Sequence, residues 1–387
     1  MTDLTHTRTR AILADLVSFP TVSADSNLQL ITYAGDLLSS AGADLSVSLD
    51  PSGTKANLFA TIGPKGDGGI VLSGHSDVVP VEGQDWSSDP FALTERDGKL
   101  YGRGTCDMKG FIAASLAMAP RFAASKLRRP LHFAFTYDEE VGCLGAQALV
   151  AELARAGIKP SVAIIGEPTM MGVIEGHKGC YEYTTEFTGM DGHGSQPDKG
   201  VNAIEYAVRY ITRLLELGEE LKTRAATSLF SPPWTTVQVG QIAGGNARNT
   251  IAGQCAVEWE IRPIHTDDSD HVKRELGAYV DGVLLPAMRK VCAHADIVTH
   301  TIGEVRGLLP VSQSEARDIV FELTGAHEAE LVSFGTEAGL FQETGISSVI
   351  CGPGSIAQAH KPDEFIEIAQ LDACLTMLGN LHDQIAA

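Results

Sequence analysis

Four short runs of apolar residues stand out along the chain, and longer stretches of helical spacing separate them. The runs cover residues 70–72, 131–136, 162–165 and 348–351. Because a strand buried on both faces of a parallel sheet has few polar positions, uninterrupted runs of this length predict such strands. The clearest helix is expected to start with Asp107 as its N-cap and to continue through Phe111 and Met118. The alternation predicts an α/β domain whose helices cover a largely parallel sheet.

A different pattern occupies the middle of the chain. It begins near residue 179 with a strand of alternating character, in which Tyr181, Tyr183 and Phe187 share one face. The elements that follow are a helix over 203–217, strands over 235–242 and 255–261, a helix over 271–285 and a strand near 297–302. This β-α-β-β-α-β order predicts a split-βαβ, ferredoxin-like domain. We expect it to be inserted, as residues 179–302, into a larger domain formed by 1–178 and 303–387.

Composition narrows the range of functions. Hydrophobic residues make up 44% of the 387 residues, which is enough for two buried cores. The formal net charge is −20 and the basic runs are short, so we expect no nucleic-acid partner and no membrane partner. The seven cysteines form no Cys-x-x-Cys pair, which favours a reducing compartment. No apolar run approaches the roughly 20 residues of a membrane span, and a cytoplasmic location is expected.

Each predicted strand leads into side chains that can bind a metal ion. These side chains are His75, Asp77, Asp138, Glu139, Glu140, Glu167 and His360, and Asp107 joins them from the glycine-rich loop 102–106. Ligands of an open parallel sheet bind beyond the carboxyl ends of its strands, so these residues are expected to converge at one edge. The predicted metal ligands are His75, Asp107, Glu140, Glu167 and His360. This nitrogen and oxygen set suits zinc, and less specifically cobalt or manganese, and it can hold two ions if one carboxylate bridges them.

Two further carboxylates have predicted roles beside the ions. Glu139, next to Glu140, is expected to take a proton from the attacking water and pass it to the departing nitrogen. Asp77, two residues after His75, is expected to accept the second imidazole N–H and so fix the tautomer of the ring. A turn role for Asp77, shortly before Pro80, stays open on local sequence. The combined pattern predicts hydrolysis by two metal ions about 3.5 to 4 Å apart.

At five places the chain resembles the M20 metallopeptidase family, in the family's order and over nearly the whole length. The matching segments are 73–80 (SGHSDVVP), 102–110 (GRGTCDMKG), 138–142 (DEEVG), 166–169 (GEPT) and 359–364 (AHKPDE). The resemblance implies that His75 and Glu167 bind one ion. It also implies that Glu140 and His360 bind the other ion, with Asp107 as the bridge.

Within the family the chain is most similar to deacetylases of N-acetylornithine. The similarity rests on segments 133–145 (FAFTYDEEVGCLG), 175–179 (EGHKG) and 352–360 (GPGSIAQAH). It implies a zinc-dependent amidohydrolase that cleaves an N-acyl amino acid and releases acetate and a free amine. A succinyl-diaminopimelate desuccinylase, another N-acyl amino acid deacylase and a dipeptidase stay as alternatives, as does a relative that only binds its ligand. The presence of every predicted ligand and of Glu139 argues against the last.

The resemblance also implies roles for residues in and near the inserted domain. That domain commonly mediates dimerisation in the family, so we expect a homodimer, in which His193 donates a hydrogen bond to the oxyanion in the site of the other subunit. Asn249 and Arg262 are expected to bind the substrate carboxylate, which suits a bidentate Arg. A surface ion pair is the alternative interpretation of Arg262. The loop with Thr336 and Glu337 is expected to lie near the site, with Glu337 facing a substrate ammonium group.

Overall fold

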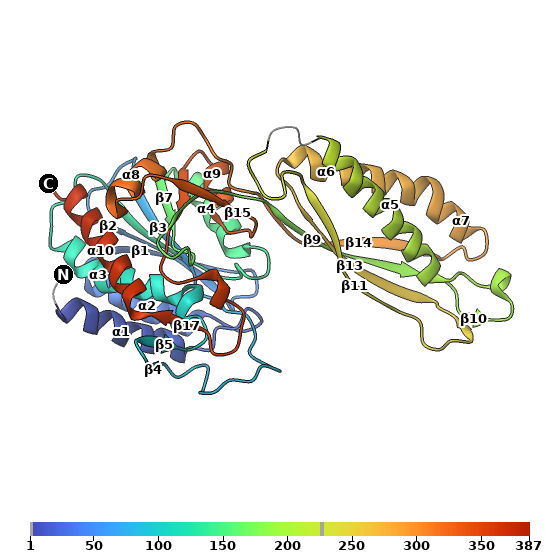
Figure 1. The fold of residues 1–387 in the computed structure, drawn as a ribbon, viewed down its shortest axis with the longest axis horizontal. Coiled ribbons are helices and arrows are strands. Elements are labelled where there is room, and N and C mark those ends of the chain that lie inside the picture. The colour runs from blue at the N-terminus through green and yellow to red at the C-terminus, as the bar shows by residue number, and fades with distance from the viewer. Residues whose placement is uncertain (1–2, 225–227) are drawn as a thin grey trace. The chain divides into compact units, whose positions relative to one another are not determined.

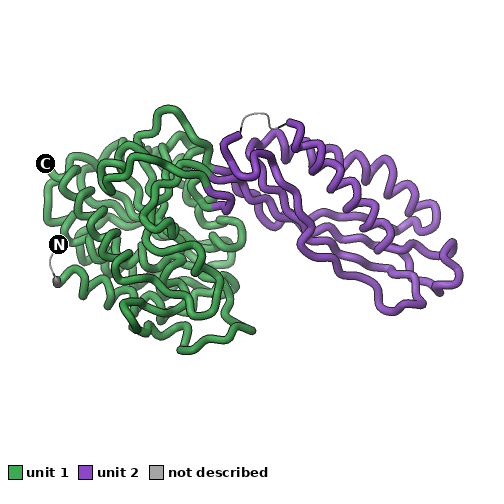
Figure 2. The backbone as a smooth tube through the Cα atoms, viewed as in Figure 1, with its two compact units in different colours: residues 1–176, 308–331, 336–387 green, residues 177–307, 332–335 purple. Residues whose placement is uncertain are grey.

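The computed structural model describes residues 3–224 and 228–387, and the chain divides into two compact units (Figure 2). Unit 1 consists of Met1–Gly176, Leu308–Leu331 and Thr336–Ala387. Unit 2 consists of His177–Gly307 and Val332–Gly335. Each unit has its own cluster of buried hydrophobic residues. Unit 2 is therefore an insertion in the sequence of unit 1, with a separate core.

An eight-stranded sheet forms the centre of unit 1 (Figure 1). The four predicted runs are its middle strands, β3 (Ile70–His75), β6 (Leu131–Thr136), β7 (Val162–Ile165) and β16 (Ser347–Ile350). They lie in the order β6-β3-β7-β16 and pair in parallel. Nearly all of their residues are buried, because helices cover both faces of the sheet. The predicted α/β fold with a largely parallel sheet is confirmed.

Flanking strands complete this sheet on both sides. They are β1 (Asp44–Leu49), β2 (Ala56–Ile62), β8 (Val173–His177) and β15 (Ala329–Val332). β2 pairs antiparallel with β6, and β1 pairs antiparallel with β2. The edge strand β1 is largely exposed, so its residues lack the continuous apolar run that identified the middle strands.

A separate three-stranded sheet lies in unit 1 as well. It contains β4 (Thr94–Arg96), β5 (Lys99–Tyr101) and β17 (Phe365–Glu367). β5 directly precedes the glycine-rich loop 102–106. A three-residue strand is too short for hydrophobic periodicity to reveal it.

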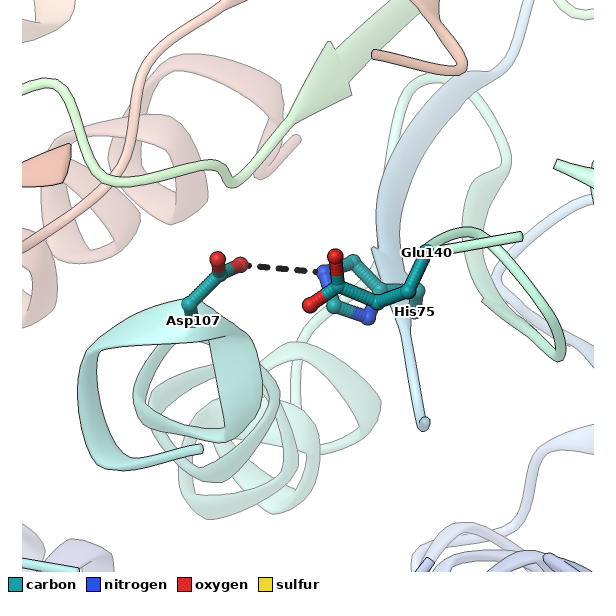
Figure 3. Close-up of side chains that lie close together, drawn as sticks. All are labelled: His75, Asp107 and Glu140. Carbon is teal, nitrogen blue, oxygen red and sulfur yellow. Dashed lines mark hydrogen bonds and ion pairs between the residues drawn. The ribbon is translucent and has the colours of Figure 1, made fainter. Parts of the chain in front are cut away.

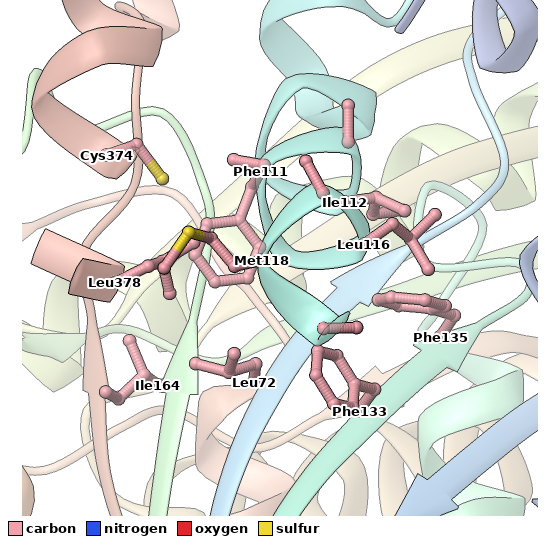
Figure 4. Packing of buried hydrophobic residues seen from close by; sticks show 14 of the residues in the cluster. Leu72, Phe111, Ile112, Leu116, Met118, Phe133, Phe135, Ile164, Cys374 and Leu378 are labelled. Carbon is pink, nitrogen blue, oxygen red and sulfur yellow. The ribbon is translucent and has the colours of Figure 1, made fainter. Parts of the chain in front are cut away.

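Helices cover the central sheet on both faces. Their bounds are α1 (Asp3–Ser18), α2 (Leu28–Ser40), α3 (Gly110–Ala123), α4 (Leu144–Ala156), α8 (Glu315–Thr324), α9 (Ala338–Glu343) and α10 (Ile368–Ile385), with short turns η1 (Thr105–Lys109) and η4 (Ile356–Gln358). Apolar residues of α1, α2, α3, α8 and α10 join the strands in one core. Figure 4 shows Phe111 and Leu116 of α3 above Leu72 and Phe133 of the sheet, beside Leu378 of α10.

The helix predicted from Asp107 begins three residues later, at Gly110, so the N-cap prediction is wrong. Asp107 has non-helical backbone angles, with φ −122° and ψ 91°. An N-cap side chain accepts a backbone N–H from the first helical turn. The carboxylate of Asp107 instead lies 3.1 Å from the imidazole Nε2 of His75.

Unit 2 has the predicted β-α-β-β-α-β order. Its main elements are β9 (Cys180–Thr188), α5 (Ala203–Arg224), β11 (Thr236–Gly244), β13 (Gln254–Arg262), α6 (Thr266–Tyr279), η3 (Val280–Leu284), α7 (Leu285–Arg289) and β14 (Asp296–Val305). The four strands form an antiparallel sheet in the order β11-β13-β9-β14. Buried positions alternate along β9 and β13, because helices cover only one face of this sheet.

Three smaller elements complete unit 2: β10 (Gly192–His193), η2 (Pro197–Lys199) and β12 (Thr250–Ile251). β10 and β12 pair antiparallel, with His193 opposite Thr250. Across residues 3–224 and 228–387, none of the helices has the length and apolar character that a membrane crossing requires.

Candidate metal centre

The carboxyl ends of three parallel strands meet at one edge of the sheet in unit 1. His75 is the last residue of β3 and pairs in register with Thr136, the last residue of β6. Glu140 follows β6 after a short turn, and Glu167 follows β7. Because parallel strands end on the same side of a sheet, these residues from separate parts of the chain share one site.

One group of donors surrounds the imidazole of His75. Its Nε2 lies 3.1 Å from Oδ1 of Asp107 and 3.6 Å from Oε1 of Glu167. Figure 3 shows the side chains of His75, Asp107 and Glu140 pointing toward one another, and these residues form a group that can hold a metal ion. Glu139 joins His75 and Glu167 in a second such group.

A further set of donors lies on the other side of Asp107. The imidazole Nε2 of His360 lies 3.0 Å from Oε2 of Glu140 and 3.5 Å from Oδ2 of Asp107. The two oxygens of Asp107 therefore face different histidines, Oδ1 toward His75 and Oδ2 toward His360. This is the placement that a bridging carboxylate between two ions requires.

The electrostatics of the site favour cations. Burial raises the pKa of Glu167 well above its usual range, and the nearby Asp107 carboxylate adds to the effect. Burial and the adjacent Glu140 act in the same direction on the pKa of Glu139. Hydrogen bonds with Asp107 and Glu140 raise the pKa of His360 to about 10. Buried carboxylates at this density are stabilised by positive charge, which divalent ions supply.

The donor set fits a divalent metal. Glu167 Oε1 is buried and, among the described residues, has no hydrogen-bond partner. An unsatisfied buried carboxylate oxygen is costly in a folded protein unless an ion or water binds it. Two imidazoles with three carboxylates are the ligand types that zinc, cobalt and manganese take in proteins. The residues present are therefore suited to hold such ions.

The backbone carbonyl of Asp77 contacts the imidazole of His75, whereas the Asp77 carboxylate binds the backbone of the loop that contains Glu139. His75 Nδ1 lies 2.9 Å from the carbonyl oxygen of Asp77 but 3.6 Å from its Oδ1. The carboxylate accepts the Ser23 hydroxyl at 2.7 Å. It also accepts the backbone N–H of Glu139 at 3.1 Å and that of Glu140 at 3.3 Å. The expected link from Asp77 to the ring is thus made mainly by the carbonyl oxygen, which residue spacing did not reveal.

Another supporting contact near the site escaped the sequence analysis. Lys55 Nζ lies 2.6 Å from Oδ1 and 2.7 Å from Oδ2 of Asp138, directly before Glu139. The side chains are 15% and 9% exposed, so this ion pair is screened little by solvent. Lys55 precedes β2 and lies far from Asp138 in the sequence, so no local pattern indicates the pair.

Thr336 and Glu337 belong to unit 1, and each is only 1% exposed. Oε1 of Glu337 accepts the Ser73 hydroxyl at 2.5 Å, and Oε2 accepts the Thr136 hydroxyl at 2.8 Å. Both oxygens therefore already bind residues of β3 and β6. Contact of Thr336 and Glu337 with a substrate stays a prediction.

The remaining predicted residues lie in unit 2. His193 is exposed on β10, and its Nδ1 lies 2.7 Å from the Ser195 hydroxyl. Asn249 lies beside it, because the carbonyl oxygen of Asn249 accepts the N–H of Gly194 at 2.8 Å. Arg262, at the end of β13, forms an ion pair with Glu260, with Nη2 2.8 Å from Oε2. Their roles with substrate stay predictions.

Fold and site together define a metal-dependent hydrolase, and comparison with known proteins identifies its family. The model of peptidase family M20/M25/M40 matches residues 71–384, and the chain belongs to this family. The chain is 37% identical over 376 residues to acetylornithine deacetylase of Proteus mirabilis, covering 95% of this chain and 94% of the relative. It is 36% identical to acetylornithine deacetylase of Shigella sonnei, with 91% of each chain covered. The protein is thus a hydrolase that cleaves amide bonds in a metal-dependent reaction.

Solved structures support the fold over the full length. An M20 family metallo-carboxypeptidase from Sulfolobus solfataricus superposes with a TM-score of 0.77 at 17% identity, with 99% of each chain covered. Human carnosine dipeptidase 1 has a TM-score of 0.72 at 19% identity, covering 98% of this chain and 97% of that one. At this identity the likeness concerns the fold alone.

Proposed function

We propose that the protein hydrolyses N-acetyl-L-ornithine to L-ornithine and acetate. The observation that carries this proposal is the meeting of five metal-competent side chains at one sheet edge, in a chain whose relatives at 35–37% identity are named acetylornithine deacetylase. Desuccinylation of succinyl-diaminopimelate, deacylation of another N-acyl amino acid and dipeptide hydrolysis are the alternative reactions, and each would use the same edge of the sheet.

Two zinc ions are the proposed cofactor. His75 and Glu167 would hold one, Glu140 and His360 the other, and Asp107 would lie between them. When bound, such ions polarise a carbonyl group and lower the pKa of a water molecule. The mixed imidazole and carboxylate donors favour zinc, while cobalt and manganese use the same donor types.

Glu139 is the proposed general base. Its carboxylate lies within 4.8 Å of the donor atoms of His75 and Glu167, so it borders the place where substrate and water would meet. The raised pKa of Glu139 suits a group that first takes a proton and then returns it to the leaving nitrogen. Asp77 would support this role, because its carboxylate binds the backbone N–H of Glu139.

The residues of unit 2 complete the proposal. We assign substrate-carboxylate binding to Asn249 and Arg262, and stabilisation of the oxyanion to His193, across a homodimer. His193 and Asn249 lie on the paired segments around β10 and β12, which supports a shared location in unit 2. Thr336 and Glu337 would contribute from unit 1.

Deacylation of a panel of N-acyl amino acids tests the proposal. The protein is freed of metal by chelation and then assayed with zinc or cobalt restored. We expect metal-dependent release of acetate from N-acetylornithine, faster than release of succinate from succinyl-diaminopimelate. Faster turnover of another member would refute the proposed substrate and leave the chemistry intact. Absence of turnover on every member would refute both.

A further inference from the structure

A buried carboxylate next to the site, Glu364, has no role in the reaction described so far. It lies four residues after His360 and is 1% exposed. Its Oε1 accepts the backbone N–H of Cys106 at 2.9 Å and of Asp107 at 3.0 Å. Its Oε2 accepts the backbone N–H of Gly104 at 3.0 Å. One side chain therefore binds three backbone groups of the loop that ends at the central carboxylate of the metal centre.

The charge of Glu364 is balanced from within the same loop. Arg103 Nη1 lies 2.7 Å from Glu364 Oε2, and both side chains are 1% exposed. Arg103 Nη2 donates to Gln84 Oε1 at 2.7 Å, and Gln84 Nε2 donates to the carbonyl oxygen of His360 at 3.0 Å. A continuous network thus joins the loop of Asp107 to the backbone of His360. Charge-assisted hydrogen bonds in a buried setting are the strong kind.

The loop needs these side-chain contacts because its glycines leave the backbone free to adopt other conformations. Gly104 has φ +82°, a conformation that residues with a side chain rarely adopt, and Asp107 has non-helical backbone angles. The carboxylate of Asp107 must nevertheless face His75 and His360 at once. Small shifts of the loop would change both distances together.

We propose that Glu364, neutralised by Arg103, is a positioning residue that sets the location of Asp107 between the two metal-binding groups. The inference rests on the proposed two-ion hydrolysis and adds a group outside the ligand set. Partners that orient metal ligands without touching the ion change metal affinity or activity about 10- to 100-fold when they are removed. A purely structural role would instead change only the stability of the fold.

The test compares two Glu→Gln variants of the full-length protein. Glu364→Gln keeps the size of the side chain but removes the charge and part of the acceptor capacity. The matched control is Glu175→Gln, because Glu175 forms an ion pair with Arg317 at 2.8 Å that shares no residue with the site. Zinc affinity is measured by competition with a chelator, and the absorption spectrum of the cobalt-loaded protein reports the geometry around the ion.

We expect Glu364→Gln to bind zinc about 10- to 100-fold more weakly and to show an altered cobalt spectrum. Glu175→Gln should match the wild type in both metal readouts. A folded Glu364→Gln protein with wild-type zinc affinity and cobalt spectrum would overturn the inference. Since these readouts need no turnover, failure of the proposed substrate leaves the test intact.

A second variant keeps the test decisive if Glu364→Gln does not fold. Gln84→Ala removes the link between Arg103 and the His360 carbonyl without leaving a buried charge unpaired. Gln84 is only partly buried, so the variant should fold. We expect a several-fold weaker zinc affinity and a smaller spectral change than for Glu364→Gln. Wild-type values for Gln84→Ala would then count against the positioning network.

Discussion

Unit 1 and unit 2 each bring acidic side chains together, and the two clusters differ in burial and in counter-ions. In unit 1, Glu167 is 4% exposed, and no lysine or arginine among the described residues forms an ion pair with it. In unit 2, Cys180, Glu182 and Glu260 also have donor atoms within 4.8 Å of one another. These three residues are partly exposed, and Arg262 forms an ion pair with Glu260.

The difference teaches that proximity of acids does not by itself define a metal site. In unit 2, solvent and a guanidinium group stabilise the carboxylates, so an added ion would have to displace Arg262. In unit 1 burial raises the pKa of Glu167, and its ion-pair partner among the described residues is the imidazole of His75 rather than a guanidinium group. A divalent cation therefore stabilises the buried carboxylates of unit 1 more than the carboxylates of unit 2, which solvent and Arg262 already stabilise.

The largest expected effect is on turnover, from Glu139→Gln in unit 1. Loss of a general base lowers kcat by about 10²- to 10⁴-fold, while metal content should stay near that of the wild type. The same change in the exposed cluster, Glu182→Gln, should leave kcat unchanged. Steady-state kinetics with metal analysis measure both. Turnover of Glu139→Gln within tenfold of wild type would contradict the assigned role.

The next effect concerns metal stoichiometry. Asp107→Asn removes the charge of the carboxylate that faces both histidines, so we expect loss of at least one ion per chain after dialysis. Glu260→Gln in unit 2 should retain the wild-type content. Elemental analysis of the dialysed proteins gives both values. Equal metal loss in the two variants would contradict the proposal that the cluster in unit 1, and not the cluster in unit 2, binds the metal.

The smallest expected effect is on the pH dependence of folding stability. It comes from a buried histidine of unit 1 that is not one of the proposed metal ligands. Burial lowers the pKa of His132 on β6 from 6.5 to about 4. Because the His132 imidazole takes up a proton more readily in the unfolded chain than in the folded one, the free energy of unfolding falls as the pH drops from 6.5 toward 4. Between pH 7 and pH 5 this residue should cost the metal-free protein about 2 kcal/mol of unfolding free energy.

Urea unfolding of the wild type and of His132→Gln, both without metal, checks this value. The variant cannot take up the proton, so its stability should decline less over the same pH interval. An identical decline in the two proteins would show that the native pKa of His132 is not lowered by burial. The Thr61 hydroxyl, 2.8 Å from Nδ1, can still bond to a glutamine, which limits the change at pH 7.

Much of the fold could be predicted from the sequence, and so could the meeting of metal-competent residues at one edge of the sheet. The four apolar runs are the parallel middle strands, since complete burial leaves an unbroken apolar pattern. The alternating pattern from Tyr181 to Phe187 marks the half-exposed sheet of unit 2. The residues that follow the strands meet at one edge because parallel strands end on the same side.

The sequence by itself determined the elements, their order and the types of residue at the site, because these depend on local periodicity and on strand direction. Only the tertiary structure decided how the residues are held. The carbonyl rather than the carboxylate of Asp77 contacts His75, and Glu364 binds the loop of Asp107 from more than 250 residues away. Such contacts depend on which loops pack together, and no pattern within a short window of sequence records that packing.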